Sequence, residues 1–511
     1  MSTPSSGSEP DNQQKTVKEL SPAGSKASPE GPERQSVQRL GLILGLLVSA
    51  QFAVVLDYSI VQLALPTIRH DLVMSLADSQ WIISAYGLTF AGFLLLGGRL
   101  SDIYGRKRLF LAGLLVFSLS SLAAGLASTE TVLISARVVQ GVGAALASAA
   151  GLALIARIFG PVGKLNQALG IFTAVSSAGF TAGLLFGGVL TETLGWRWIF
   201  FVNVPIGIFA TILASRTLPD FKAERATGRS IDIPGAISVT AGLMLLVYGL
   251  SEVGNGSTSL LTYGSFVAAA LVLGSFLAIE RRAASPIMPL RFLGRRTIFL
   301  ANATALLTFA TTVPWIFFMA TYFQVLLAYS PISAALAMVP GALIYFAIGG
   351  FGAPKFVARF GAKPVLVGAM LALAAGLILT SRLSAGSGYL TEILPAMLVA
   401  SVGGALSATA SNIAALAGTQ RGEEGVASGL INTSRQVGGP VGLGLTVGAV
   451  GVLTHGAGLI GNQAEVVSAL QDGFVVAACF AALAVVTSLL LKGKPEGKGR
   501  TTVVHETPTP S

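Results

Sequence analysis

Long apolar runs are the feature that most constrains how this chain can fold. The sequence of 511 residues contains fourteen of them, and an apolar helix of roughly 20 residues is long enough to cross the hydrocarbon core of a bilayer. Only 11% of the residues are charged, whereas soluble domains carry about 25%. Because the short alternating strands of a membrane barrel are absent, the sequence predicts an all-α membrane protein with fourteen transmembrane helices.

The expected spans are 40–64, 80–98, 108–127, 131–158, 166–190, 197–216, 232–251, 262–281, 298–324, 333–353, 363–382, 390–417, 426–453 and 471–491. The charges between them predict the orientation, because Lys and Arg concentrate in cytoplasmic loops. With both termini in the cytoplasm, the outer loops contain only Arg69, Arg197 and Arg382. The net charge of +10 therefore reflects topology and not a nucleic-acid partner. We expect a multi-pass protein of the cell membrane, plasma or bacterial inner, with both termini cytoplasmic.

Internal echoes indicate a duplicated architecture. Glycines recur at one spacing in the fifth and thirteenth spans, at Gly170, Gly179 and Gly183 and at Gly429, Gly438 and Gly442. Repeated six-helix halves around a central site are known in membrane proteins. The expected organisation is 1–38 as a disordered cytoplasmic tail poor in large apolar residues, 39–218 as an N-terminal six-helix half, 219–297 as a central helix hairpin with linkers, 298–492 as a C-terminal six-helix half and 493–511 as a cytoplasmic tail.

Asp57 is the one acidic residue well inside a predicted span. A carboxylate at the centre of a membrane helix costs about 2.5–3.5 kcal/mol on the insertion scale, so its presence favours a proton or cation site. The alternative is that Asp57 lies near the outer end of its span and contacts water. The first interpretation is favoured.

Arg137 is the complementary cation, in the fourth span. A buried guanidinium needs acceptors or a counter-charge, so we expect it to face a cavity or another helix and not lipid. Gln140, three residues further on, shares its helix face. The alternative is a structural arginine bonded to carbonyl groups of the first span. Spacing alone leaves open whether Arg137 reaches Asp57.

Two glycine-containing segments carry separate expectations. The short basic connection between the second and third spans includes Gly98, Asp102, Gly105, Arg106 and Lys107, and its glycines permit a tight turn between helices. In the fifth span the small residues Gly179, Gly183, Gly187 and Gly188 form a stripe that predicts close helix packing.

Other polar residues inside the spans are candidates to line a cavity or to form hydrogen bonds between helices. They are Gln62, Asn302, Gln324, Asn412, Arg435 and Gln436.

From about Gly41 to Leu491 the sequence resembles the fourteen-span drug:proton antiporters of the major facilitator superfamily. The segment L-D-Y-S-I-V-Q-L-A-L-P is similar to the first-span signature of that group, with Asp57 at its acid. The segment G-R-L-S-D-I-Y-G-R-K resembles the inner-loop gate of the superfamily, with Asp102 and Arg106 at matching positions. A-R-V-V-Q-G-V-G resembles the fourth-span motif implicated in proton transfer, and G-W-R-W-I-F-F-V-N-V-P is typical of the fourteen-span branch.

The resemblance implies the major facilitator fold and a proton-coupled exporter of lipophilic small molecules, such as drugs, antibiotics or secondary metabolites. Such a protein works by alternating access, needs no cofactor or metal, and functions as a monomer in the lipid bilayer. Asp57 and Arg137 would then couple protons, and Asp102, Gly105 and Arg106 would control the conformational switch.

Two departures from the family pattern bear on this interpretation. The antiporter signature has Gly-Pro in the fifth span, whereas Gly183 is followed by Leu184. This difference favours, as an alternative, a uniporter or a proton-linked importer of a small metabolite. The thirteenth span has Ser, Arg and Gln where cation-selective relatives carry an acid, which points away from dicationic substrates. An enzyme is not expected, because no nucleophile–base pair or metal-ligand cluster is evident.

Overall fold

The computed structural model describes residues 32–221, 232–283, 286, 290–417, 419, 424–455 and 462–491. Over these ranges the regular structure is entirely helical. Fourteen helical segments are long and apolar enough to cross a membrane. The prediction of an all-α membrane fold with fourteen spans is therefore confirmed, and each expected span overlaps one of these segments.

The first part of the chain contains α1 (Pro32–Asp71), α2 (Leu76–Ser79), α3 (Trp81–Tyr104), α4 (Arg106–Gly125), α5 (Glu130–Phe159), α6 (Leu165–Thr193), α7 (Trp198–Phe201) and α8 (Asn203–Thr217). The middle contains α9 (Ile233–Gly254), α10 (Leu260–Arg282) and α11 (Leu290–Leu293). The last part contains α12 (Arg296–Thr321), α13 (Pro331–Ala347), α14 (Ala353–Phe360), α15 (Ala362–Thr380), α16 (Leu394–Ala417), α17 (Glu424–Leu453) and α18 (Gln463–Leu490). Three π-helical turns extend these helices, namely η1 (Tyr322–Leu326), η2 (Ile348–Gly352) and η3 (Tyr389–Ile393).

The start of α1 differs from the expected tail boundary. The tail was expected to reach residue 38, but the helix begins at Pro32. A proline fits the first helical position, where its missing N–H would have no partner, and no further proline follows before Pro66. The rest of the expected N-terminal tail (1–31) and the expected C-terminal tail (493–511) lie outside the described residues.

Small residues bring neighbouring helices into backbone contact. An added methyl group at Gly113 of α4 would lie 2.5 Å from the backbone nitrogen of Ala147 in α5. A methyl group at Gly143 of α5 would lie equally close, at 2.5 Å, to the backbone nitrogen of Phe117 in α4. This reciprocal contact holds α4 and α5 together and fixes how α5 presents its polar face.

The glycine stripe of α6 packs against α1. A methyl group at Gly183 would lie 2.7 Å from the carbonyl oxygen of Leu56, and one at Gly187 would lie 2.5 Å from that of Ile60. Gly179 contacts α1 one turn earlier, and Gly188 faces Pro331 of α13. The stripe thus sets the spacing of α6 from two different helices.

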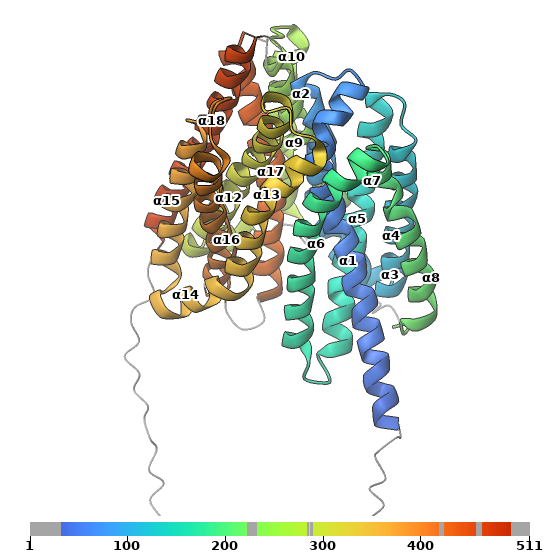
Figure 1. The fold of residues 1–511 in the computed structure, drawn as a ribbon. Helices are drawn as coiled ribbons and strands as arrows, with labels where there is room; N and C mark the ends of the chain where they lie inside the picture. The colour runs from blue at the N-terminus through green and yellow to red at the C-terminus, as the bar shows by residue number, and fades with distance from the viewer. Residues whose placement is uncertain are drawn as a thin grey trace, which may run out of the picture. The chain divides into compact units, whose positions relative to one another are not determined.

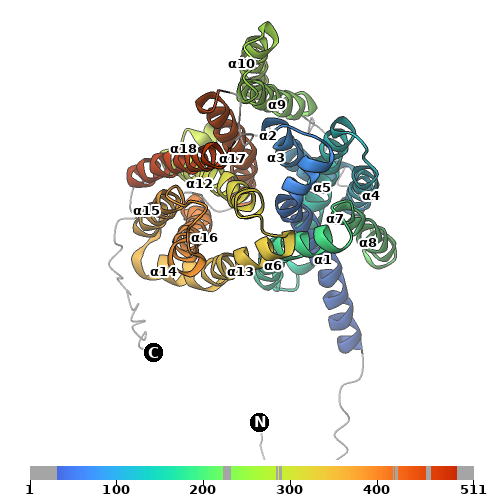
Figure 2. The same cartoon turned by 45° about the horizontal axis from the view of Figure 1, so that its top comes forward.

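Helices α6 and α13 lie side by side (Figures 1 and 2) and meet at one end. There the backbone N–H of Ile332 donates to the Glu192 carboxylate at 2.8 Å. Nearby, the Gln324 amide donates to the carbonyl oxygen of Leu63 in α1 at 2.9 Å. Towards the opposite end of α6, a methyl group added at Gly170 would meet no atom within 4 Å. The end of α6 that carries Gly188 and Glu192 therefore contacts the start of α13, at Pro331 and Ile332.

The middle helices α9 and α10 pack against each other, and α9 also contacts α3 and α17. Thr240 of α9 fills the space beside Gly92 of α3, and Gly254 of α9 lies against Gly451 of α17. Leu260, at the start of α10, is 88% exposed. We attribute that exposure to a lipid-facing surface, because α10 is apolar enough to span the membrane.

Candidate functional site

Asp57, near the middle of α1, is fully buried and has three side-chain donors. One carboxylate oxygen accepts from Gln140 Nε2 at 2.9 Å and from Asn203 Nδ2 at 2.7 Å. The other accepts from Arg137 Nη1 at 2.5 Å. Because no part of the carboxylate is exposed, the alternative in which Asp57 contacts water at the outer end is wrong.

Arg137 of α5 is also fully buried. Its Nε donates to the carbonyl oxygen of Ile82 in α3 at 2.9 Å, and its Nη1 donates to Gln140 Oε1 at 2.7 Å as well as to Asp57. The Tyr86 ring lies 4.2 Å from the guanidinium carbon, a cation–π contact. Arg137 therefore bonds a carbonyl group of the second span. The structural alternative expected carbonyl groups of the first span as its partners.

Close helix packing explains how these side chains meet. Arg137 and Gln140 are three residues apart and share one face of α5. Beside them, Gly141 lies where any side chain would collide with Thr89 and with the carbonyl oxygen of Tyr86. The missing side chain lets α5 approach α3 closely enough for Arg137 to reach the Ile82 carbonyl group.

The arrangement balances its charges but leaves two polar atoms unpaired. One buried anion faces one buried cation, which offsets much of the desolvation that each would suffer alone. Within the described part of the chain, Arg137 Nη2 and Asn203 Oδ1 have no hydrogen-bond partner. Because an arginine guanidinium stays protonated in proteins, the Asp57 carboxylate is the member of this pair that can take up a proton.

Asn203 was not among the candidate residues. It belongs to the G-W-R-W-I-F-F-V-N-V-P segment, which is typical of the fourteen-span branch. It is the first residue of α8, follows an apolar stretch and is fully buried. A lone amide between apolar residues inside a span was the signal that could have identified it.

Replacing Asn203 with Leu is expected to lower the free energy of unfolding by about 1.5–3 kcal/mol, because a hydrogen bond to a charged group is lost. Asn302→Leu is the matched control. The Asn302 side chain donates only to the carbonyl oxygen of Ile298 and accepts from Ser434, so about 0.5–1.5 kcal/mol is expected. The measurement is the thermal unfolding of the purified protein in detergent. Equal losses in both variants would contradict a special role for Asn203.

The other predicted polar residues do not bond to Asp57. Gln62, five residues along α1, is 1% exposed, and both ends of its amide lack a hydrogen-bond partner among the described residues. Asn302 links α12 to α17 through Ser434 at 2.9 Å. Gln324 links η1 to α1, as described above. Asn302 and Gln324 thus connect helices, and none of the three residues joins the Asp57 cluster.

Arg435 lies in α17 and forms a second polar centre. Its Nη2 donates to the carbonyl oxygen of Ala408 and, at 3.4 Å, to Ser411 Oγ, both in α16. With its amide oxygen turned towards Arg435, Asn412 accepts from both terminal nitrogens, at 3.0 and 3.1 Å. The next residue, Gln436, is half-buried.

The side-chain bonds of the predicted gate residues Arg106 and Lys107 lie within residues 39–218, the expected N-terminal half. Arg106 donates to the Asp102 carboxylate at 2.9 Å, and the two side chains are 21% and 42% exposed. Lys107 Nζ donates to the carbonyl oxygen of Leu218, just after α8, at 2.8 Å. Gly105 has φ of 97°, a value that requires glycine between α3 and α4, and Gly98 has no neighbouring atom within 4 Å of an added methyl group.

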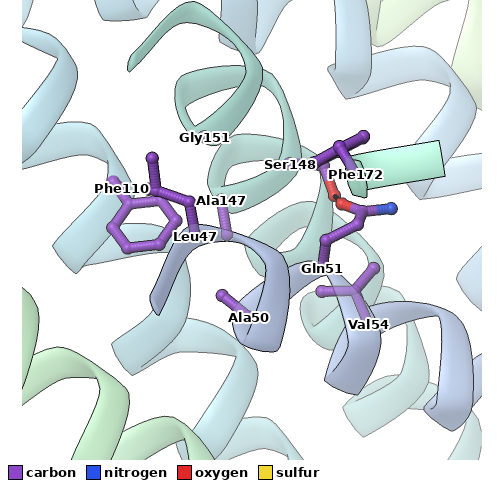
Figure 3. A pocket seen from close by; sticks show the side chains of 9 residues that line it. All are labelled: Leu47, Ala50, Gln51, Val54, Phe110, Ala147, Ser148, Gly151 and Phe172. Atoms are coloured by element: carbon purple, nitrogen blue, oxygen red, sulfur yellow. Dashed lines mark hydrogen bonds between the residues drawn. The ribbon is translucent and has the colours of Figure 1, made fainter. Parts of the chain in front are cut away.

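A small pocket lies between α1, α4, α5 and α6 (Figure 3). Its polar lining is the pair Gln51 and Ser148, whose side chains share a hydrogen bond of 2.8 Å. The other lining residues are Leu47, Ala50, Val54, Phe110, Ala147, Gly151 and Phe172. Asp57 and Arg435 are not part of its wall.

Known proteins are similar to this chain over most of its length. The family model of the Major Facilitator Superfamily matches residues 47–443. The cephamycin export protein CmcT of Amycolatopsis lactamdurans is 39% identical over 477 residues, which cover 91% of this chain and 95% of that protein. The puromycin resistance protein of Streptomyces alboniger is 35% identical over 476 residues, which cover 91% of this chain and 94% of that protein.

A solved structure of a D-xylose-proton symporter supports the fold. It aligns with a TM-score of 0.63 at 15% identity, over 90% of this chain and 99% of the symporter. At that identity the likeness concerns the fold and not the substrate. Together with the family match, it shows that the chain belongs to the Major Facilitator Superfamily and is a multi-pass membrane transporter, not an enzyme.

Proposed function

We propose that this protein is a proton-driven exporter of lipophilic small molecules, including antibiotics. The observation that carries the proposal is the buried Asp57 carboxylate, held by Arg137, Gln140 and Asn203 inside the membrane span. The names of its relatives, a cephamycin export protein and a puromycin resistance protein, support the direction and the substrate class.

The proposed coupling step is the protonation of Asp57. A proton from the outer side converts the carboxylate to a neutral acid, which removes the charge that Arg137 pairs with. Arg137 then changes partners, and its spare Nη2 donor is available for a new contact. Release of the proton to the cytoplasm restores the ion pair. Each step requires only these residues and the proton gradient, and no cofactor.

Alternating access is proposed between two six-helix halves, 39–218 and 298–492, on either side of the hairpin region 219–297. With both termini in the cytoplasm of a cell-membrane protein, the contacts of Gln324 and Glu192 lie at the outer end. These contacts support a conformation that is closed to the outside. The Asp102–Arg106 pair forms within the N-terminal half, so we interpret it as the gate when it does not engage the other half. The proposed functional unit is a monomer.

The alternative of uniport or import depends on Leu184. Helix α6 runs without an internal proline from Leu165 to Thr193, and Leu184 is buried at 4% exposure. A proline would kink the helix there, and its absence leaves the fifth span regular. Dependence of transport on the proton gradient separates exchange from uniport.

The experiment is puromycin uptake into everted vesicles that contain the full-length protein. We expect accumulation in the wild type that collapses with a protonophore, and none in Asp57→Asn, because the titratable group is lost. Asp71→Asn is the matched control, since Asp71 also pairs with an arginine, Arg197, but is 48% exposed. Undiminished gradient-driven accumulation by Asp57→Asn would rule out this coupling role.

A further inference from the structure

Arg435 is a half-buried cation for which no anionic partner is found among the described residues. It lies eight residues after the start of the α17 span, which runs from Ala427 to Leu453. Arg137, Arg197 and Arg106 pair with Asp57, Asp71 and Asp102, but in the described part of the chain no ion pair involves Arg435. Its Nε is buried and has no hydrogen-bond partner. An arginine in such a position normally has a counter-charge.

The partners of Arg435 occupy one face of α16. Ala408 and Asn412 are four residues apart, so they lie one turn apart on the same face. Gly404 lies one turn before Ala408, and an added methyl group there would lie 3.4 Å from Cε2 of Tyr345 in α13. Tyr345 and Arg435 therefore lie next to each other along α16.

Aromatic side chains from both parts of the chain lie beside Arg435 or beside its neighbours Tyr345 and Gly439. The Phe309 ring of α12 lies 5.6 Å from the Arg435 guanidinium carbon. The Phe180 ring of α6 lies 6.3 Å from the Tyr345 ring. One turn along α17 from Arg435, an added methyl group at Gly439 would lie 3.2 Å from the Tyr58 hydroxyl group of α1. All these aromatic residues are half-buried, in contrast to the fully buried Asp57 cluster.

We propose that Arg435, Phe309, Tyr345 and Phe180 form a substrate site that selects aromatic organic anions. Arg435 binds the carboxylate or a similar anionic group, because guanidinium donors match the geometry of such oxygens. The rings contact the apolar body of the molecule. This inference rests on the proposed export function and specifies its substrate class.

The site is also connected to the Asp57 cluster. Tyr58 follows Asp57 directly, and its ring lies 6.1 Å from that of Tyr86. Tyr86 in turn stacks on Arg137 at 4.2 Å. Tyr58 therefore lies beside α17 near Arg435, and Tyr86 lies beside the Asp57–Arg137 ion pair. The contact between these two rings connects the site where the anion binds with the carboxylate that is protonated.

The test compares three probes with one aromatic body, namely anthracene carboxylate, the matching carboxamide and the matching methylammonium. The readout is the rise in the thermal unfolding midpoint of the purified full-length protein with increasing probe concentration. The wild type is expected to bind the carboxylate about tenfold or more tightly than the carboxamide, and Arg435→Gln to lose that preference. Arg435→Lys retains a charge and is expected to keep part of it.

Tyr345→Leu is the matched control for the aromatic wall, and it is expected to weaken all three probes alike. If the wild-type protein binds the carboxylate no better than the carboxamide, the proposal is overturned whether or not the variants fold. Equal weakening of all three probes by Arg435→Gln would also overturn it, since that result describes a structural arginine. Puromycin has no anionic group for Arg435 to bind, so Arg435→Gln vesicles are expected to retain gradient-driven puromycin uptake. That measurement tests the export function separately, because uptake depends on Asp57.

Discussion

Arg137→Met is expected to lower the free energy of unfolding by about 3–5 kcal/mol, the usual cost of removing one partner of a buried ion pair. The carboxylate of Asp57 then remains fully buried with only the amides of Gln140 and Asn203 as donors. The cation–π contact with Tyr86 and the bond to the Ile82 carbonyl group disappear as well. The measurement is thermal unfolding in detergent.

The double variant Asp57→Asn with Arg137→Met provides the control. Removing both charges leaves no uncompensated ion, so most of the lost stability is expected to return. Transport is expected to be absent in both Arg137→Met and the double variant, because neither contains the Asp57 carboxylate together with the Arg137 guanidinium. A double variant as unstable as Arg137→Met alone would show that Arg137 acts through packing and not through its charge.

Gly187→Ala is the second change with a large expected effect. The added methyl group would lie 2.5 Å from the carbonyl oxygen of Ile60, a backbone atom that cannot rotate away. Helices α1 and α6 must separate, and overpacking of this kind costs about 1–3 kcal/mol. Because α6 also contacts α13, we expect transport to fall more than stability. Gradient-driven uptake and thermal unfolding are measured on the same preparation.

Gly170→Ala is the matched control in the same helix. A methyl group there meets no atom within 4 Å, so the substitution is expected to leave stability unchanged or slightly improved, as alanine favours helix. Similar losses in the two variants would mean that the glycines matter for helix flexibility and not for the contact with α1.

The fold was predictable because a membrane leaves few alternatives. Each span is set by the length of its apolar run, and all fourteen expected spans overlap helices of that kind. The exact ends of the helices were less predictable. The start of α1 at Pro32 fell before the expected boundary, since polar residues without a helix breaker can extend an apolar helix. The π-helical turn η1, at the end of α12, could not be expected from the length of the apolar run, which continues through it.

The site was only partly predictable, for geometric reasons. Asp57 and Arg137 stood out because ionised groups are costly in a span. Their contact depends on the approach of α5 to α3 at Gly141, which involves residues far apart in the chain. Asn203 was missed because an amide costs less than a charge inside a span, so that signal is weaker than the one that identified Asp57 and Arg137. The aromatic residues around Arg435 come from four helices, and their convergence required the packed structure.

The bonds of Gln324 and Glu192 have an evolutionary consequence. In each, one partner is a main-chain group, the carbonyl oxygen of Leu63 or the N–H of Ile332. Any residue but proline at position 332 keeps the main-chain N–H, so that bond persists as long as Glu192 is kept. Leu63 is fully buried in the core, so evolution can exchange it only for an apolar side chain that fits, while Gln324 keeps its acceptor.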